Sequence, residues 1–294
     1  MNKRERYLTI GGFLAPAVAL YAVFFLFPMA QAFWVALFQW RGVSMNSDFV
    51  GIDNFRKLLT QDPIFWQSLG HNVVFLVTSL VIVLPLALFL AVMLSRKTRG
   101  SHTYRAIYLF PNVISVVAVA VLWSFVYHPT FGILNSLLKT IGTGGLVKGW
   151  LGEPGTALPC VVVTSIWYSL GFYIVLLLAG VQNVPRSYYE AAWIDGAGGW
   201  QAFRHITIPL IWEVLKLAVI YLVIHSLNVF GLVWVMTEGG PSNHTDTVLT
   251  YLYRLAFIES NFGYATALGV VVFVVIFCVT LGFNRLMRRE TVEY

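Results

Sequence analysis

Six apolar runs, each long enough to cross a lipid bilayer, constrain the fold of this chain more than any other feature. The hydrocarbon core of a bilayer is about 30 Å thick, and an α-helix needs about 20 residues to cross it. The apolar runs lie at about residues 8–38, 70–95, 106–127, 158–183, 213–236 and 264–284. Because no water is available inside the bilayer to satisfy exposed backbone groups, these runs predict six transmembrane helices.

The low charge content excludes a mostly soluble protein. Charged residues make up 11% of the 294 residues, whereas a soluble domain has about 25%. The formal net charge of +6 comes from Lys and Arg residues that flank the apolar runs and form no basic stripe, so nucleic-acid binding is not indicated. The segments between the runs are too short to fold independently. We therefore expect one all-α membrane domain over residues 1–294.

The Lys and Arg residues are distributed unequally between the two sides of the expected bundle. Six spans place both termini on one side, and the side richer in Lys and Arg is the cytoplasmic one. One side holds Lys3, Arg4, Arg6, Arg96, Lys97, Arg99, Arg105, Arg186, Arg204, Arg285, Arg288 and Arg289. The other side holds Arg41, Arg56, Lys57, Lys139, Lys148 and Arg254. We therefore expect both termini in the cytoplasm.

Sequence motifs for catalysis and for metal binding are missing. No Gly-Lys dipeptide is present, so the chain lacks the P-loop that cradles nucleotide phosphates. The six histidines show no HExxH or paired ligand spacing, and no serine lies in a GxSxG motif. Cys160 and Cys278 have no CxxC partner and are expected to be buried thiols. We expect no catalytic residue, no metal site and no ATP hydrolysis by this chain alone.

The longest inner loop, residues 184–209, carries a helical pattern of its own. Ser187 and Glu190 have the spacing of a capping box, so a short helix is expected to begin there. That helix should run to about Asp195, where Gly196 ends it. On these grounds alone, the loop is either a rigid element for a partner protein or an ordinary connector at the membrane surface.

The same loop resembles a known motif. The string Glu190-Ala191-Ala192-x-x-Asp195-Gly196-Ala197 resembles the EAA loop of permease subunits in binding-protein-dependent ABC importers. Further segments along nearly the whole chain resemble the carbohydrate branch of that family, the maltose and glycerol-3-phosphate type. These segments are Gly51–Phe55, Gly132–Asn135, Thr237–Pro241, Tyr251–Tyr253, Ala256-Phe257 and Gly263–Ala265. One departure is Glu213, at a position where many relatives have a second proline.

The resemblance implies the type I ABC importer permease fold, in which a cytoplasmic coupling helix docks on a partner ATPase. By this resemblance, Glu190 meets a basic residue of the ATPase, and Ala191 and Ala192 allow close packing. Asp195 belongs to the same ATPase-coupling motif, and Gly196 supplies its turn.

The resemblance also implies the partners and the location. The expected partners are a second permease subunit as a homologous heterodimer partner, two ATPase subunits, an extracytoplasmic solute-binding protein and membrane lipid. ATP and Mg are bound by the partner ATPase, so no cofactor is expected on this chain. The assembly is expected in the bacterial plasma (inner) membrane.

Two of the expected spans carry polar and aromatic side chains on one helical face. The two sets are Ser165, Tyr168, Ser169 and Phe172 in the fourth span, and Leu222, His225, Ser226 and Val229 in the fifth. Aromatic rings stack on the apolar faces of a sugar, and hydroxyl and imidazole groups bond its hydroxyls. The resembling sugar permeases take substrate contacts from these two helices. Both faces are therefore candidates for the substrate path; the alternative is that they only hold helices together.

We expect a permease subunit of an ATP-driven ABC importer that moves a sugar or sugar-like solute into the cytoplasm by alternating access. The alternative is a self-sufficient secondary carrier or channel for a small polar solute. The spans show neither an inverted-repeat pattern nor mid-membrane charges, which counts against this alternative. An integral-membrane enzyme is a further alternative, and no convergent catalytic set supports it.

Overall fold

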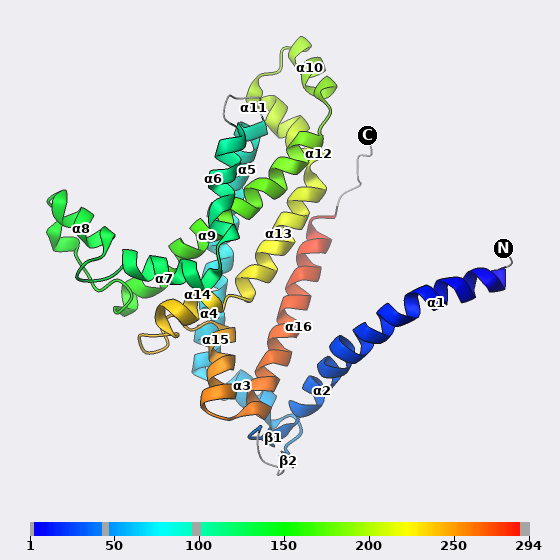
Figure 1. Ribbon diagram of the computed structural model, residues 1–294, viewed down its shortest axis with the longest axis vertical. Helices are drawn as coiled ribbons and strands as arrows, with labels where there is room; N and C mark the ends of the chain where they lie inside the picture. The colour runs from blue at the N-terminus through cyan, green and yellow to red at the C-terminus, as the bar shows by residue number, and fades with distance from the viewer. Residues whose placement is uncertain (1–2, 43–46, 96–100, 289–294) are drawn as a thin grey trace. The chain divides into compact units, whose positions relative to one another are not determined.

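The computed structural model describes residues 3–42, 47–95 and 101–288, and it is almost entirely helical (Figure 1). Four residues that contribute to the expected orientation, Arg96, Lys97, Arg99 and Arg289, lie outside the described residues. The chain divides into two compact units, one of Met1–Asp62 with Leu252–Val274 and one of Pro63–Tyr251 with Val275–Tyr294. The single domain over residues 1–294 stays a prediction.

Among the described residues, five helices are long and apolar enough to span a membrane. They are Ile10–Val35, Pro63–Ser95, Pro154–Asn183, Trp212–Thr237 and Phe262–Leu286. The remaining expected span is a bent pair, Ala106–Val113 and Val116–Val126, with an angle of 102° between its halves. The structure therefore has six spans if the pair counts as one, and the bend within residues 106–126 is a feature that the apolar run did not predict.

The bend in the third span has a local cause. Pro111 lies inside the first half and removes a backbone donor from that helix. Four residues later, Ser115 adopts an extended conformation with ψ of 136° and ends the helical path before Val116. The second half therefore continues in a new direction.

The first unit contains the N-terminal helices and a small antiparallel hairpin. Its elements are α1 (Lys3–Tyr21), η1 (Ala22–Leu26), α2 (Phe27–Val35), β1 (Phe38–Trp40), β2 (Ser47–Phe49), α3 (Asp53–Gln61), η5 (Arg254–Ile258) and the first part of α16 (Phe262–Leu286). Asn54 fixes α3 to the end of α2, because its Nδ2 donates to the carbonyls of Ala36 at 2.9 Å and Phe38 at 3.0 Å. Gly263 lets the Phe38 carbonyl lie directly against α16, where any Cβ would overlap it.

The second unit contains most of the remaining helices. Its elements are α4 (Pro63–Thr78), η2 (Ser79–Val83), α5 (Leu84–Ser95), α6 (Ser101–Val113), α7 (Val116–Val126), α8 (Ile133–Thr140), η3 (Gly144–Leu146), α9 (Pro154–Asn183), α10 (Arg186–Ile194), α11 (Gly199–Ala202), η4 (Phe203–Thr207), α12 (Ile208–Leu210), α13 (Trp212–Leu227) and α14 (Gly231–Thr237). Helix α15 (Val248–Tyr253) crosses the border between the two units.

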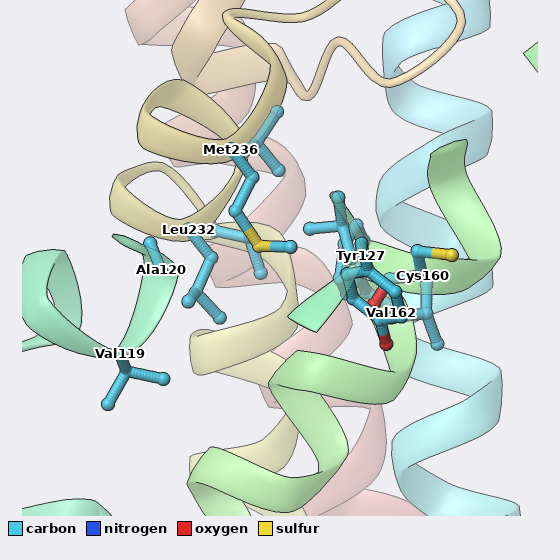
Figure 2. Packing of buried hydrophobic residues seen from close by; sticks show 11 residues of the cluster. Val119, Ala120, Tyr127, Cys160, Val162, Leu232 and Met236 are labelled. Carbon is cyan, nitrogen blue, oxygen red and sulfur yellow. Dashed lines mark hydrogen bonds between the residues drawn. The ribbon is translucent and has the colours of Figure 1, made fainter. Parts of the chain in front are cut away.

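Helix α9 is the centre of the second unit. One buried cluster joins it to α5 and α13 through residues such as Ala87, Ile174 and Ala218. A second cluster joins it to α7 and α14 (Figure 2), and it includes Val162 of α9 and Leu232 of α14. The expected burial of Cys160 is confirmed in this second cluster, whereas that of Cys278 is wrong, because Cys278 is exposed on α16.

Candidate functional site

The loop between the fourth and fifth spans contains the expected short helix, α10. The helix ends at Ile194, and Gly196 follows in the left-handed conformation with φ of +77°. The Gly196 amide donates to the Trp193 carbonyl at 3.1 Å, and the Ala197 amide donates to the Ala192 carbonyl at 2.8 Å. This pair of bonds is a Schellman motif, which favours glycine at the left-handed position. The structure thus places Gly196 at a sharp, well-defined turn.

The start of α10 differs from the expected capping box. The N-cap residue is Pro185, which has no side-chain capping bond, and Ser187 already lies inside the first turn. The Ser187–Glu190 capping box was therefore wrong. A one-sided cap occurs at the next helix instead, where the Gly198 amide donates to Oε1 of Gln201 at 2.8 Å. The Glu190 side chain is thus not needed to close the start of its own helix.

Helix α10 is joined firmly to the ends of the spanning helices. The Tyr189 hydroxyl lies 3.0 Å from Oγ1 of Thr207, and this hydrogen bond links α10 to η4. Tyr189 also packs on a buried cluster of Val181, Val184 and Ile211, which come from the end of α9, the residue after it and the start of α13. Helix α10 is therefore in direct contact with the adjoining ends of α9 and α13.

The outer face of α10 is open to a partner. Glu190, Ala191, Asp195 and Gly196 are exposed, and Ala192 is half-buried. Beyond them, Trp193 is 64% exposed and Ile194 is 86% exposed. Large exposed apolar side chains of this kind often mark a protein-binding surface.

A pocket of about 730 Å³ lies beside α10. Its lining comes from the ends of α5 and α9, from α10 and from α11 with η4. Arg186 and Glu190 contribute charged groups to this pocket, while Val92, Val181 and Phe203 contribute apolar surface. The pocket is a concave surface next to α10. It lies at the end of the unit that the Lys and Arg distribution predicts to be cytoplasmic.

The path from the loop into the fifth span is irregular. Residues Phe203–Thr207 form a π-helix, and the short α12 that follows contains Pro209. Helix α13 begins only at Trp212, and its first turn holds an ion pair between Glu213 and Lys216. The helical path is therefore interrupted just before Glu213, although residue 213 is not a proline.

The residues expected to line the solute path on α9 divide between two environments. Phe172 is 38% exposed and Tyr168 is half-buried. Ser165 and Ser169 are buried, and the Ser169 hydroxyl donates to the Ile166 carbonyl of its own helix at 3.4 Å. The aromatic members of the set are therefore accessible, and the two serines face the interior of the chain.

The expected set in the fifth span divides in the same way. His225 is exposed, whereas Leu222, Ser226 and Val229 are buried. Ser226 faces α4 and η2, because its carbonyl accepts from Nδ2 of Asn72 at 2.7 Å and its hydroxyl lies 3.5 Å from that of Ser79. A role of the three buried residues in the path stays a prediction.

Sequence reasoning missed one residue of the accessible face. Tyr221 is 52% exposed, and its ring meets that of Phe172 with 5.7 Å between centroids, which connects α13 to α9. Tyr221, His225 and Asn228 follow i, i+4 and i+7 spacing, and all three are exposed. That spacing is present in the sequence, but the set predicted from the sequence lies on the adjoining stripe, which begins at Leu222. We define the exposed polar face as Tyr168, Phe172, Tyr221, His225 and Asn228.

Metal chemistry finds no support among the side chains that the structure describes. Within residues 3–42, 47–95 and 101–288, no group of three or more His, Cys, Asp or Glu residues could hold a metal ion. Among the described residues, the candidate sites are the open face of α10, as a protein-binding surface, and the exposed polar face of α9 and α13, as a solute-binding surface.

Comparison with known proteins identifies most of the chain as a membrane component of a transport system. Residues 83–292 match the family described as "Binding-protein-dependent transport system inner membrane component". The match covers α10 and the exposed polar face.

Curated relatives and a solved structure extend the match. The diacetylchitobiose uptake system permease protein of Streptomyces coelicolor is 40% identical over 88% of this chain and 76% of its own length. The lactose transport system permease protein of Rhizobium radiobacter is 36% identical over 91% of both chains. A bacterial alginate ABC transporter, solved in complex with an alginate pentasaccharide-bound periplasmic protein, contains a chain that superposes with a TM-score of 0.84. That chain is 25% identical, and the match covers 98% of each chain.

Proposed function

Since the chain belongs to the family of binding-protein-dependent transport system inner membrane components, we propose that it forms part of an ATP-driven importer for a sugar or sugar-like solute. It is a multi-pass permease subunit, so its task is transport and not catalysis. The single observation that carries the proposal is the family match, which includes the helix-turn element of α10 and both spans of the exposed polar face.

The class of solute is supported by the relatives. The names of two relatives refer to diacetylchitobiose and lactose, and the similar structure belongs to an alginate transporter. The exposed polar face combines rings that can stack on a sugar with an imidazole and an amide that can bond its hydroxyls. A carbohydrate therefore fits both the relatives and the local chemistry.

The energy for import comes from partner chains in this proposal. Two ATPase subunits bind ATP and Mg, and one of them receives α10, with Glu190 opposite a basic residue. Ala191 and Ala192 let the surfaces approach closely, and the turn at Gly196 keeps the helix short and rigid. Closure of the ATPases moves α10, and the Tyr189 contacts pass that movement to α9 and α13.

A second permease subunit, homologous to this one, completes the membrane pore. Support comes from the family match, because the family is described as a component of a transport system. The first span, Ile10–Val35, is apolar enough to pack against lipid or a neighbouring subunit. Both termini lie in the cytoplasm in this proposal, and the solute-binding protein docks on the opposite side of the membrane.

The test is reconstitution of the chain with a co-purifying permease, ATPase and solute-binding protein in proteoliposomes, using lactose, diacetylchitobiose and a non-carbohydrate solute as cargo. We expect uptake that requires both ATP and the binding protein and is restricted to sugars. Uptake by this chain alone without ATP would instead support a self-sufficient carrier or channel. ATP-dependent uptake of only the non-carbohydrate solute would leave the importer intact and refute the substrate class.

A further inference from the structure

An exposed apolar ridge lies on α8, the short helix between α7 and α9. Ile133, Leu137 and Ile141 follow each other at intervals of four residues, which puts them on one side of the helical path. Each is 56% to 69% exposed. We define these three residues as the α8 ridge.

The orientation of α8 is fixed by its opposite side. Asn135 is 1% exposed, and its Nδ2 donates to the carbonyls of Pro129 at 3.0 Å and Lys148 at 2.9 Å. Its Oδ1 accepts from Nε1 of Trp150 at 2.7 Å. Leu134, on the neighbouring side, packs on the cluster formed by α7, α9 and α14. The α8 ridge therefore points outward because the rest of the helix is held in place.

The third side of α8 is polar. Ser136 and Lys139 are exposed there, and helical spacing turns both away from the α8 ridge, whereas the exposed Thr140 lies at the edge of the ridge. A helix with one apolar side, one polar side and its axis outside the spanning segments matches the pattern of helices that lie in the lipid–water interface.

The segment that precedes α8 in the chain, α7, also exposes apolar side chains. Val121, Leu122 and Phe125 are exposed on α7, the second half of the bent third span. The ring centroids of Phe125 on α7 and of Phe131, two residues before the start of α8, lie 6.2 Å apart. The exposed apolar surface of a spanning segment is covered by lipid or by another membrane helix. The α8 ridge follows this segment in the chain, at the border between the membrane and water.

The chemistry of the α8 ridge favours lipid over a soluble partner. It consists of aliphatic side chains, whereas protein-binding hot spots are rich in Trp, Tyr and Arg. Lys139 is the only charged residue of α8 and lies on its polar side, where an ammonium group can reach lipid phosphates. The other nearby lysine, Lys148, lies 3.9 Å from the Glu153 carboxylate.

We propose that α8 is an interfacial anchor, with the α8 ridge inserted among the acyl chains and Lys139 directed to the phosphates of the lipid headgroups. The anchor lies on the side of the membrane opposite α10, because the continuous helix α9 connects the segment after α8 to α10. It holds the segment between α7 and α9 at a fixed depth during transport.

The experiment places an environment-sensitive NBD fluorophore on single cysteines in the assembled transporter, in lipid nanodiscs. Cys160 and Cys278 are first replaced by alanine, and Leu137→Cys is compared with the matched variant Ser136→Cys on the polar side. We expect the label at position 137 to emit at a shorter wavelength than the label at position 136. Doxyl lipids labelled near the headgroup should quench the label at position 137 at least threefold more than the label at position 136. Aqueous iodide should show the reverse preference.

Two outcomes overturn the proposal. If iodide quenches both labels equally, α8 projects into water. If the label at position 137 is shielded from lipid-borne and aqueous quenchers alike, a protein surface covers the α8 ridge. Ile141→Cys provides a second position on the ridge in case the Leu137 variant assembles poorly, and ATP hydrolysis of each complex verifies assembly.

Discussion

At the scale of single residues, one amide connects three parts of the second unit. Asn72 of α4 is fully buried; its Nδ2 donates to the Ser226 carbonyl, and its Oδ1 accepts from the Val248 amide at 2.9 Å. The Val248 amide is at the start of α15, where no earlier helical carbonyl is available to it. A single side chain thus fixes the end of α13 to the start of α15.

Replacing Asn72 with leucine should lower the stability of the subunit. The side chain keeps a similar size but leaves the buried Val248 amide without an acceptor, at a cost of about 1–3 kcal/mol. The measurement is the melting temperature of the purified complex. Asn228→Leu is the matched control, because Asn228 is exposed and its Nδ2 donates only within its own helix, to the Ile224 carbonyl at 2.8 Å. Equal melting temperatures for the two variants would contradict the bridging role.

Substitutions on the two sides of α13 should separate transport from packing. His225→Leu removes a polar group from the exposed polar face, and loss of a hydrogen bond to a desolvated sugar hydroxyl costs about 1–3 kcal/mol, or roughly 5- to 100-fold in uptake. Tyr221→Ala should act in the same direction by removing a stacking ring. Ser226→Ala, on the buried side, should leave uptake per assembled complex near wild type. Loss of uptake in Ser226→Ala alone would move the path to the buried stripe.

The sequence predicted a polar face on each of two spans, but it did not predict which side of α13 is exposed. A soluble helix shows its buried side by a contrast between apolar and polar residues, and this contrast is weak in a helix that lipid surrounds. Ser226 and His225 are both polar, yet one faces α4 and the other is exposed. Only the contacts of neighbouring helices distinguish them, and those contacts cannot be obtained from the spacing within one span.

At the scale of elements, two helices approach each other through a glycine. A Cβ at Gly171 of α9 would overlap the backbone carbonyl of Tyr108 in α6, so the two helices are in direct backbone contact there. Such a contact cannot be relieved by rotation of a side chain.

The variant Gly171→Ala should therefore separate α6 from α9 and reduce the yield and melting temperature of the complex. The control is Gly155→Ala at the start of the same helix, where an added Cβ meets no atom within 4 Å. Alanine is favoured over glycine inside a helix by about 0.5–1 kcal/mol, so the control should be neutral or slightly stabilised. If both variants behave alike, α6 and α9 do not pack as described.

Helix α10 provides the second test at this scale. Glu190→Lys should leave the subunit folded, because Glu190 is exposed and no capping box at the start of α10 depends on it. ATPase association should fall sharply, since a reversed charge in a docking contact typically costs several kcal/mol. Glu190→Gln, which removes the charge and keeps the shape, should give an intermediate loss. Pull-down of the ATPase and solute-stimulated ATP hydrolysis are the readouts; wild-type values for Glu190→Lys would refute the docking role.

At the scale of the whole molecule, hydropathy was the most reliable guide. The bilayer permits only backbone structures that satisfy their own hydrogen bonds, so long apolar runs have to be helical. The same argument says nothing about the direction of a helix after a break, and the bend of 102° between α6 and α7 depends on the local geometry near Pro111 and Ser115. The error at Cys278 has a similar origin, because an apolar neighbourhood in the sequence does not distinguish burial in protein from exposure to lipid.

The orientation of the molecule can be tested with two cysteines. Ser187→Cys on α10 should react with a membrane-impermeant maleimide only from the cytoplasmic side. Ser242→Cys, in the exposed turn after α14, should react only from outside. The expected pattern follows from the excess of Lys and Arg on the α10 side. The opposite labelling would invert the molecule and remove the proposed contact with a cytoplasmic ATPase.

Helix α9 has one more implication. It runs for 30 residues, about 45 Å, with one end at the outer Trp150 segment and the other next to α10. A continuous helix of this kind carries a displacement equally well in both directions, and thermodynamic linkage makes the effects of two ligands on each other reciprocal. In the proposed importer, docking of the solute-loaded binding protein on one side of the membrane should therefore favour ATP-driven closure of the ATPase subunits on the other side. Closure should favour the docked binding protein by the same free energy.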